Sequence, residues 1–382
     1  MKNRRKTKPK NLAALTIYLE SIVKKINKLF SPVFVKALTW SLLALVSCIT
    51  PFEPDFKEQP DAVVVQGFIS NEPGPYTIQL VRPANYSFAG YSIGIKNAVV
   101  YITDDAGNRE NLLEVPESGL YKTQNLQGET GRTYQLHMEI DGKKYESKPE
   151  LIRDAGEIDR VYDEPFQEID ALSNQSRLGG WNVYIDTKDP IENGNYYRWN
   201  FLHYKLVGTC GSINDRFGNP LYRVSCCGDC WDIIRCTGVN CINVANDALI
   251  NGKQISRKQV GTVPVGCRDR YYLEVEQQAL SRDSYVFWKT VRQLLQNTGG
   301  VFDVAPSAVP GNITCLSDPD EQVLGFFSAV GISRKAHVVD RRNSEIVNCP
   351  PDLPDVPGFP APCTTCVQSL YRTPQKPLYW NF

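Results

Sequence analysis

The most restrictive feature of this sequence is a two-residue alternation of apolar and polar side chains over residues 133–140. Successive side chains of a β-strand point to opposite faces, so the pattern predicts a strand with one buried and one solvated face. Asp141-Gly142 follows, and an Asp-Gly pair favours a tight hairpin turn into residues 143–147. The predicted buried face comprises Tyr134, Leu136, Met138 and Ile140, and His137 is expected among the solvated residues.

Several shorter β-prone runs precede this hairpin. They cover residues 62–69, 76–80 and 98–103, and a turn signal at 104–108 closes the last of them. Many short strands with closely spaced turns are typical of an immunoglobulin-like β-sandwich. We therefore predict a mainly β protein in which residues 61–155 form an N-terminal immunoglobulin-like β-sandwich.

A second set of alternating runs begins at Gly156. Residues 156–162, 180–186 and 196–202 have the pattern of longer strands, and the last two are rich in aromatic side chains. Such side chains commonly form a core or cross-strand pairs. We predict a larger β-rich domain over residues 156–348, with its boundary near residue 155.

One helix is predicted within this second region, over residues 281–297. Ser281 is a suitable N-cap, and Asp283 lies in the first turn, where the helix dipole favours an acid. Tyr285, Trp288, Val291 (or Arg292) and Leu295 keep helical spacing, and Gly299-Gly300 ends the pattern. The apolar stripe predicts one helix packed on the sheet.

The cysteines are concentrated in the second half of the chain. Of twelve, one is Cys48 and the other eleven follow residue 209. Residues 208–242 form a cysteine-rich insertion with few aliphatic side chains, and residues 349–382 form a Pro-rich, cysteine-containing tail. Segments this poor in apolar groups need covalent links to stay ordered. The disulfide candidates are Cys210, Cys226, Cys227, Cys230, Cys236, Cys241, Cys267, Cys315, Cys349, Cys363 and Cys366.

Zinc is the competing interpretation for some of these cysteines. Cys227-x-x-Cys230 and Cys363-x-x-Cys366 have the spacing of two half-sites, but about 130 residues separate them, far more than in a zinc ribbon. An exported chain also favours disulfides. We therefore expect disulfides and no metal, and the odd number leaves at least one cysteine free or paired with another chain.

The N-terminus has the pattern of an export signal. Lys36 precedes an apolar run of about ten residues, too short to cross a bilayer as a helix, and the run ends in Leu45-Val46-Ser47-Cys48. This ending resembles the bacterial lipobox, so residues 1–47 are predicted to be a signal peptide and Cys48 the lipidation site. The long charged region before the run is either an extended signal or a sign that translation starts downstream, near Leu29 or Val33.

Residues 48–60 are predicted to be a lipidated tether, because Pro51, Pro54 and Pro60 interrupt regular structure. Glu53, Asp55 and Glu58 resemble the acidic stretch that directs some lipoproteins to the cell surface. The residues before Cys48 hold ten of the 42 lysines and arginines and one of the 42 acids. The remaining chain is therefore acidic, with a net charge near −9, which argues against nucleic-acid binding.

Several separated motifs resemble a Bacteroidota lipoprotein family known only as a domain of unknown function (DUF4249). They are Val63–Ile69, Gly119-x-Tyr121, Gly131-x-Thr133-Tyr134, Tyr285-x-x-Trp288-Lys289, Gly300–Pro306, Pro310–Ile313 and Val323–Ala329. The resemblance runs from about Cys48 to about Arg341. It implies an outer-membrane lipoprotein that accompanies a TonB-dependent transporter, and it supplies no catalytic residues.

No catalytic motif is found in the sequence. The His-Glu-x-x-His, P-loop and Gly-x-Gly-x-x-Gly patterns are missing, and His137, His203 and His337 lie in strand-like runs. Gly90-Tyr91-Ser92-Ile93-Gly94 has the letters of the Gly-x-Ser-x-Gly pattern, but it is not interpreted as a nucleophile elbow. Asp318, Asp320 and Glu321 lack the EF-hand pattern and are interpreted as solvated loop acids.

We expect a non-enzymatic accessory or ligand-capture lipoprotein without cofactor. It would be lipid-anchored in the outer membrane, face the cell surface and partner a TonB-dependent transporter barrel. The alternative is a self-standing surface adhesin or glycan-binding lipoprotein, which the aromatic side chains and predicted disulfides suggest.

Overall fold

The computed structural model describes part of the chain, and it leaves out residues 1–61, which include the predicted signal peptide, Cys48 and the tether. The internal contacts of the chain divide it into two compact units, residues 1–57 and 58–382. Every described residue lies in the second unit. No helix in the described part is long and apolar enough to cross a membrane. The described residues are 62–83, 92–169, 176–208, 212–218, 220–223, 229–238, 241–248, 250–266, 270–296, 309–342, 366–369, 371–377 and 380.

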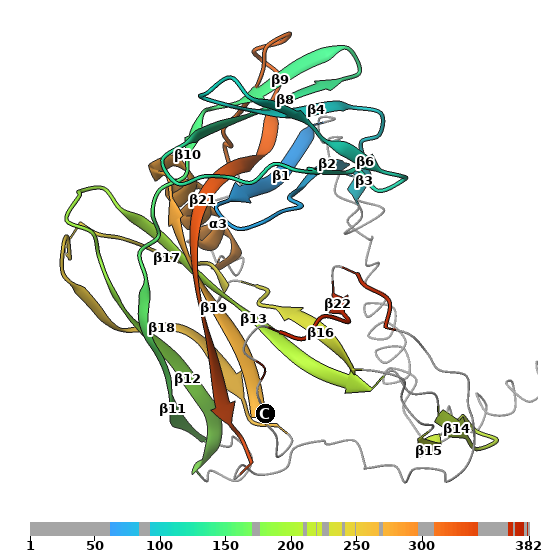
Figure 1. Ribbon diagram of the computed structural model, residues 1–382, viewed down its shortest axis with the longest axis vertical. Helices are drawn as coiled ribbons and strands as arrows, with labels where there is room; N and C mark the ends of the chain where they lie inside the picture. The colour runs from blue at the N-terminus through green and yellow to red at the C-terminus, as the bar shows by residue number, and fades with distance from the viewer. Residues whose placement is uncertain are drawn as a thin grey trace, which may run out of the picture. The chain divides into compact units, whose positions relative to one another are not determined.

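A large central sheet organises the second unit (Figure 1). Its main path is β22-β16-β13-β19-β21-β1-β2-β7-β6, with β17 beside β13 and β3 beside β2. The eleven strands are β1 (Val63–Ser70), β2 (Thr77–Pro83), β3 (Ser92–Gly94), β6 (Leu113–Val115), β7 (Leu120–Lys122), β13 (Tyr196–Gly208), β16 (Asp229–Arg235), β17 (Asn243–Asn246), β19 (Arg270–Leu280), β21 (Val323–Asp340) and β22 (Arg372–Thr373).

The long strand β21 joins the two halves of this sheet. Its first residues pair in parallel with β1, Val63 opposite Val323 through Ser70 opposite Val330, and its later residues pair antiparallel with β19. Gly325 has a φ of +89°, and a Cβ there would lie 1.9 Å from the Val65 carbonyl oxygen. Only glycine fits so close an approach in that conformation.

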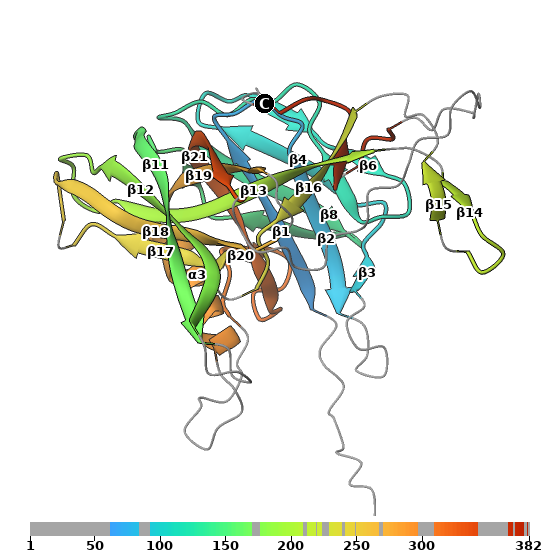
Figure 2. The same ribbon diagram turned by 90° about the horizontal axis from the view of Figure 1, so that it is seen from below.

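Two smaller sheets cover parts of the central sheet, and Figures 1 and 2 show them at different ends of it. The six-stranded sheet contains β4 (Val99–Asp104), β5 (Arg109–Asn111), β8 (Thr133–Ile140), β9 (Lys143–Ser147), β10 (Glu150–Leu151) and β20 (Ile313–Cys315). The three-stranded sheet contains β11 (Ile158–Ile169), β12 (Ser176–Lys188) and β18 (Gln254–Pro264). A separate pair, β14 (Ser212–Asn214) and β15 (Pro220–Arg223), lies in the cysteine-rich insertion.

Each smaller sheet encloses a separate hydrophobic core. The first core joins β1, β2 and the start of β21 to the six-stranded sheet, and Tyr134, Leu136, Met138 and Ile140 are buried in it as their alternation predicts. The second core joins β13, β19 and the end of β21 to the three-stranded sheet, and Trp181, Tyr197 and Trp199 are buried in it. The dense aromatic residues of the second region are thus mainly core residues.

The hairpin and the helix form close to their predicted positions. Asp141 and Gly142 both have positive φ, 52° and 79°, as the tight turn requires. The helix α3 spans Arg282–Gln296, and the Ser281 hydroxyl accepts the Ser284 backbone N–H at 3.1 Å. Tyr285 and Trp288 pack on a small cluster of Leu280, Val330 and Ile332. Leu295, predicted to pack, is 57% exposed.

The predicted split into an N-terminal immunoglobulin-like domain and a second domain is not confirmed. Strand β1 pairs with β21, and β20 pairs with β9, so hydrogen bonds cross residue 155 in both sheets. Ile313, Phe327 and Ala329 belong to the first core. The confirmed statement is coarser: the described chain is mainly β, contains sandwiched sheets and carries disulfides.

Candidate functional site

Disulfides form in the region where covalent links were predicted. Cys230 pairs with Cys366, and Cys236 pairs with Cys241, with Cα–Cα distances of 5.6 and 5.5 Å. The first bond joins one cysteine from each half of the spacing considered for zinc. Cys48, Cys210, Cys226, Cys227, Cys267, Cys349 and Cys363 lie outside the described residues.

Cys315 corrects one expectation. It was a disulfide candidate, but it is a free thiol that is 1% exposed in the first core. Its strand β20 pairs with β9, and the thiol makes side-chain hydrogen bonds with Tyr145 and Glu321 at the edge of the first core.

The disulfide between Cys230 and Cys366 fastens the end of the chain to β16. We call the described residues 366–369, 371–377 and 380 the C-terminal strap. Strand β22 of the strap pairs with Trp231 and Asp232, and the Ile233 N–H donates to the Tyr371 carbonyl at 2.8 Å. Arg372 forms an ion pair with Asp232. The strap therefore covers an edge of the central sheet that would otherwise expose unpaired backbone groups.

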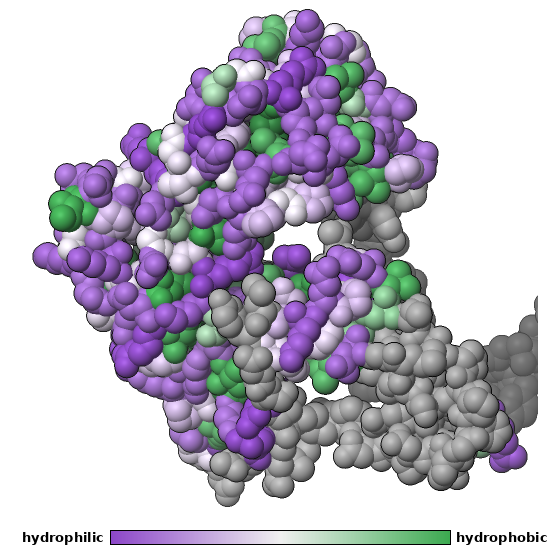
Figure 3. Space-filling view, viewed as in Figure 1, coloured by the Kyte–Doolittle hydropathy of each residue, from purple (hydrophilic) through white to green (hydrophobic). Residues whose placement is uncertain are grey.

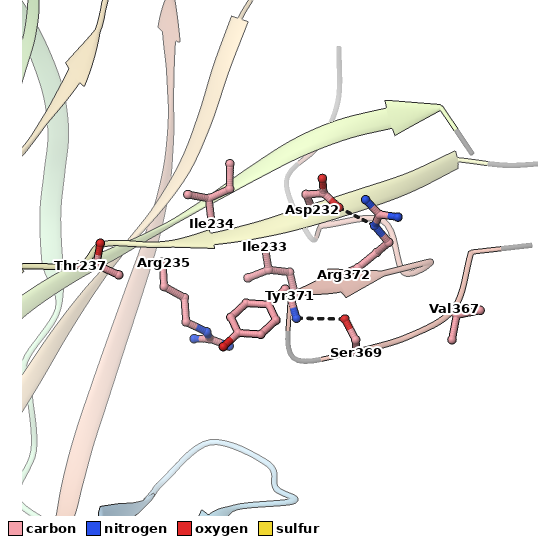
Figure 4. A pocket seen from close by; sticks show the side chains of 9 residues that line it. All are labelled: Asp232, Ile233, Ile234, Arg235, Thr237, Val367, Ser369, Tyr371 and Arg372. Atoms are coloured by element: carbon pink, nitrogen blue, oxygen red, sulfur yellow. Dashed lines mark hydrogen bonds and ion pairs between the residues drawn. The ribbon is translucent and has the colours of Figure 1, made fainter. Parts of the chain in front are cut away.

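An open groove with a volume of about 650 Å³ lies between the strap and β16 (Figure 4). Its lining is mainly apolar, and several of its apolar side chains are exposed: Ile234 by 46%, Tyr371 by 68% and Val367 by 72%. This volume lies within the usual range for small-molecule sites. The lining residues are Asp232, Ile233, Ile234, Arg235, Thr237, Val367, Ser369, Tyr371 and Arg372.

Arg235 is the last residue of β16 and lines this groove. Its side chain and that of Tyr371 point toward one another in Figure 4. Arg235 is exposed and has no hydrogen-bond or ion-pair partner among the residues that the structure describes. Cross-strand register places it opposite Leu202 of β13, and Leu202 lies opposite Glu274 of β19. Directly opposed residues share a face of a sheet, so Arg235 and Glu274 lie on the same side.

A charged strip continues along that side of the sheet. The Arg334 guanidinium contacts both Glu72 oxygens at 2.5 and 2.8 Å, lies 3.7 Å from Glu274 and pairs with Glu276. Glu274 also accepts the Tyr272 hydroxyl at 2.6 Å. The carboxylates of Glu274 and Glu276 are nearly buried, whereas the Arg334 side chain is 29% exposed. The strip thus offers solvent one guanidinium surrounded by three carboxylates.

Burial and charge act in opposite directions within the strip. Burial disfavours the charge of Arg334, but its contacts with Glu72 and Glu276 outweigh this and raise the pKa of its guanidinium. Burial raises the pKa of Glu276, and the neighbouring Arg334 only partly opposes that rise. Arg235 also favours the charged form of Glu276. Arg235 of the groove therefore interacts electrostatically with the strip.

The three histidines have partners that the sequence did not reveal. His137, expected to be solvated, has a 20% exposed side chain that stacks on Tyr101, lies 3.0 Å from the Thr103 hydroxyl and is 3.8 Å from Glu146. Burial lowers the pKa of His137. His203 contacts the Tyr272 carbonyl at 2.7 Å, and His337 contacts Asp163 at 2.6 Å. Strand pairing creates these contacts, so local sequence could not predict them.

The hydroxyl, imidazole and carboxylate of Thr103, His137 and Glu146 have the order of a catalytic triad. However, they project from one face of the pairing β4-β8-β9, and none of them lines the strap groove or the cavity near Ala62. Their contacts join strands β4, β8 and β9 of the six-stranded sheet.

The predicted loop acids lie at a second cavity, of about 660 Å³, near the first described residue, Ala62. Glu321 is not a solvated acid: it accepts hydrogen bonds from Lys143 at 2.6 Å and Tyr145 at 2.7 Å. Asp318 also lies 3.6 Å from Lys143. Among the described residues, no group of three or more histidine, cysteine or acidic side chains is arranged to hold a metal ion.

These features define a β-rich, disulfide-linked protein with an open groove suited to binding. A sequence profile described as "Domain of unknown function (DUF4249)" matches residues 49–336, and the chain belongs to that family. No curated protein matches the chain. The match covers the central sheet through most of β21, and the C-terminal strap lies beyond the matched residues.

Proposed function

We propose that this protein is a lipid-anchored, non-enzymatic accessory or ligand-capture partner of a TonB-dependent transporter, held in the outer membrane and facing the cell surface. One observation carries the proposal. The family match begins at residue 49, directly after Cys48 of the lipobox-like sequence. The residues that the family shares are thus those that cleavage before Cys48 would leave.

The anchor follows from simple chemistry. Cleavage before Cys48 would expose an amine and a thiol that can both be acylated, and several acyl chains hold a protein stably where one does not. The stretch between Cys48 and β1 has roughly 14 residues and reaches at most about 50 Å when extended. A folded body could therefore remain close to a membrane-embedded barrel.

The groove and the charged strip support binding as the role of that body. The groove exposes apolar side chains beside Arg235, which has no direct partner among the residues that the structure describes, and the strip places a guanidinium among carboxylates. Hydrophilic groups cover most of the face shown in Figure 3, and hydrophobic residues there form small separate groups. Such a surface suits a selective, reversible contact rather than a permanent apolar interface.

The structure gives less support to the alternative of a glycan-binding adhesin. The aromatic pair Tyr162 and Tyr184 lies on the three-stranded sheet, with ring centroids 5.6 Å apart. Arg160 lies over the Tyr162 ring at 4.4 Å, and Arg257 lies over the Tyr184 ring at 4.7 Å. These guanidiniums cover ring faces that a sugar would need for stacking.

Lipidation is tested with the full-length chain expressed in its host and fed an alkyne-bearing fatty acid. The wild type should incorporate the label and start at Cys48 by mass spectrometry, whereas Cys48→Ala should carry no label. Cys236→Ala is a matched control that should label like the wild type. A mature chain that retains residues before Cys48 would contradict the proposal.

The partner is tested by crosslinking intact outer membranes and purifying the tagged full-length protein. We expect a TonB-dependent barrel to be recovered with the wild type and to be lost with Cys48→Ala. Surface accessibility is measured in the same cells by protease shaving. Recovery without any barrel, together with binding to a glycan array, would favour the adhesin alternative and refute the transporter partnership.

A further inference from the structure

The groove under the C-terminal strap combines exposed apolar side chains with an arginine side chain. Val367 and Tyr371 present apolar surface to solvent beside the half-buried Ile233. Arg235 points to the same side of β16 as Tyr371, whereas Ile234 points to the other side (Figure 4). Apolar surface in water is unfavourable, and concave apolar surface commonly marks a binding site. The positive charge of the Arg235 guanidinium gives that surface a definite polarity.

The charges around the groove narrow the class of ligand. Arg372 and Asp232 neutralise one another at the rim. Arg235 is therefore the lining cation without a direct partner in the part of the chain described here. An arginine forms its strongest hydrogen bonds with a carboxylate or phosphate, often through two parallel contacts. The groove is thus complementary to a molecule with an apolar body and an anionic head.

The neighbourhood of Arg235 also explains where the head would lie. Figure 4 shows the side chains of Arg235 and Tyr371 directed toward one another on one side of β16. The carboxylates of the charged strip lie farther along that side and would repel an anion. The head is therefore confined to the Arg235 end of the groove, and the apolar body extends along Ile233 and Val367.

We propose that the strap groove binds a single-chain amphiphile with a carboxylate head, such as a free fatty acid, and that Arg235 recognises the carboxylate. This deepens the proposed function, on whose ligand-capture role it rests. The disulfide between Cys230 and Cys366 holds both walls of the groove in place. Binding would remove exposed apolar side chains from water and would give Arg235 an anionic partner.

The test uses the full-length lipidated protein in nanodiscs of zwitterionic phospholipid. A decanoate probe carrying a photoreactive diazirine is added and irradiated, and labelled peptides are mapped by mass spectrometry. We expect labelling within residues 229–238 and 366–377. At half-saturating probe, Arg235→Gln should reduce the yield about tenfold, because a charge-assisted hydrogen bond is lost, and Arg235→Lys should retain part of it.

Two controls separate charge from general hydrophobicity. Arg216→Gln removes another exposed arginine and should label like the wild type. A decanol probe of the same chain length should label wild type and Arg235→Gln equally. Equal decanoate labelling of wild type and Arg235→Gln would overturn the proposal, as would labelling outside these peptides.

A competition experiment distinguishes a free amphiphile from a membrane lipid as the source of the ligand. Excess unlabelled decanoate should abolish labelling, and inorganic phosphate should not. If anionic phospholipid in the disc removes the label instead, the occupant is a membrane lipid and the free amphiphile is refuted. Labelling requires no barrel, so a loss of labelling would not contradict the proposed transporter partnership. Failure to recover a barrel would likewise not contradict the proposed ligand site in the groove.

Discussion

The two ends of the central sheet are stabilised by different means. At the β1–β2–β7 end, the six-stranded sheet covers a large core that includes Val65, Ile78 and Phe327, all fully buried. At the β16–β22 end, a disulfide, a two-residue strand pairing and the contact of Trp380 with Trp231 and Tyr272 hold the strap. The apolar content of each segment therefore decides whether a core or a covalent link maintains its structure.

This difference is consistent with the location of the groove. A close-packed core leaves little empty volume, whereas a sheet edge held by a disulfide can keep apolar side chains both ordered and exposed. Ile234, Val367 and Tyr371 are exposed at the stapled end. Of the two cavities, the strap groove is thus the one lined by exposed apolar side chains, whereas charged and polar side chains make up most of the lining of the cavity near Ala62.

The largest expected effect tests the packed end. Phe327→Ala removes a fully buried ring from the first core and should lower the free energy of unfolding by about 4 kcal/mol. Phe68→Ala is the matched control, because Phe68 is 45% exposed on the neighbouring strand β1, and it should cost less than about 1 kcal/mol. Urea denaturation measures both. Equal losses would show that the first core does not dominate at this end.

The next effect tests the stapled end. Cys230→Ala/Cys366→Ala opens a link between residues 136 apart, which should cost about 3 kcal/mol. Trypsin should then cleave the strap faster at Arg372. Cys236→Ala/Cys241→Ala opens a link across only 5 residues and should cost about 1 kcal/mol. A strap that stays protected without its disulfide would contradict the comparison.

Local patterns predicted local structure well. The alternation over 133–140 matches β8, the Asp141-Gly142 turn has the required positive φ values, and α3 lies within the predicted helix. The parallel pairing of β1 with β21 was missed, because about 260 residues separate the partners and each strand alone fits several neighbours. Gly325 was the available signal, since a strand glycine marks close backbone approach.

The candidate site was predicted only in part. Clustered cysteines with few aliphatic residues indicated disulfides, and Cys230 and Cys366 were among the candidates. Their pairing and the groove that results were not predictable, since sequence does not encode which distant cysteines meet. The charged strip was missed for the same reason: Glu72, Glu274 and Arg334 come together only through the pairing of the strands.

A third effect tests a weak point in the packed end. Glu150 is buried beside Asn312, whose side-chain nitrogen lies 3.2 Å from a Glu150 oxygen. Burial raises the pKa of Glu150 from 4.5 to about 7, and hydrogen bonds from Ser281 and Asn312 oppose this rise only in part. The folded state therefore holds a proton that the unfolded chain releases at lower pH. The free energy of unfolding should fall as pH rises from about 4.5 to about 7.

Glu150→Gln removes this titration and keeps an oxygen for Asn312. The variant should be more stable than the wild type by about 2 kcal/mol at pH 8 and should lose the advantage at pH 4. Thermal unfolding across this range measures the difference. Asp283→Asn, at a half-exposed site near Glu150, is the control and should leave most of the pH dependence in place. An unchanged slope in Glu150→Gln would show that the buried carboxyl does not govern it.

The smallest expected effect tests whether aromatic packing stabilises the strap in addition to the disulfide. Trp380 lies with its ring centroid 6.1 Å from Trp231 and 5.4 Å from Tyr272, and Trp380→Ala should cost about 1 kcal/mol. Tyr371→Ala, at a mostly exposed ring in the same strap, should cost less. Urea unfolding and the rate of tryptic cleavage at Arg372 report both. If Trp380→Ala costs as much as losing the disulfide, the strap has a hydrophobic core of its own, and the contrast between the two ends of the sheet disappears.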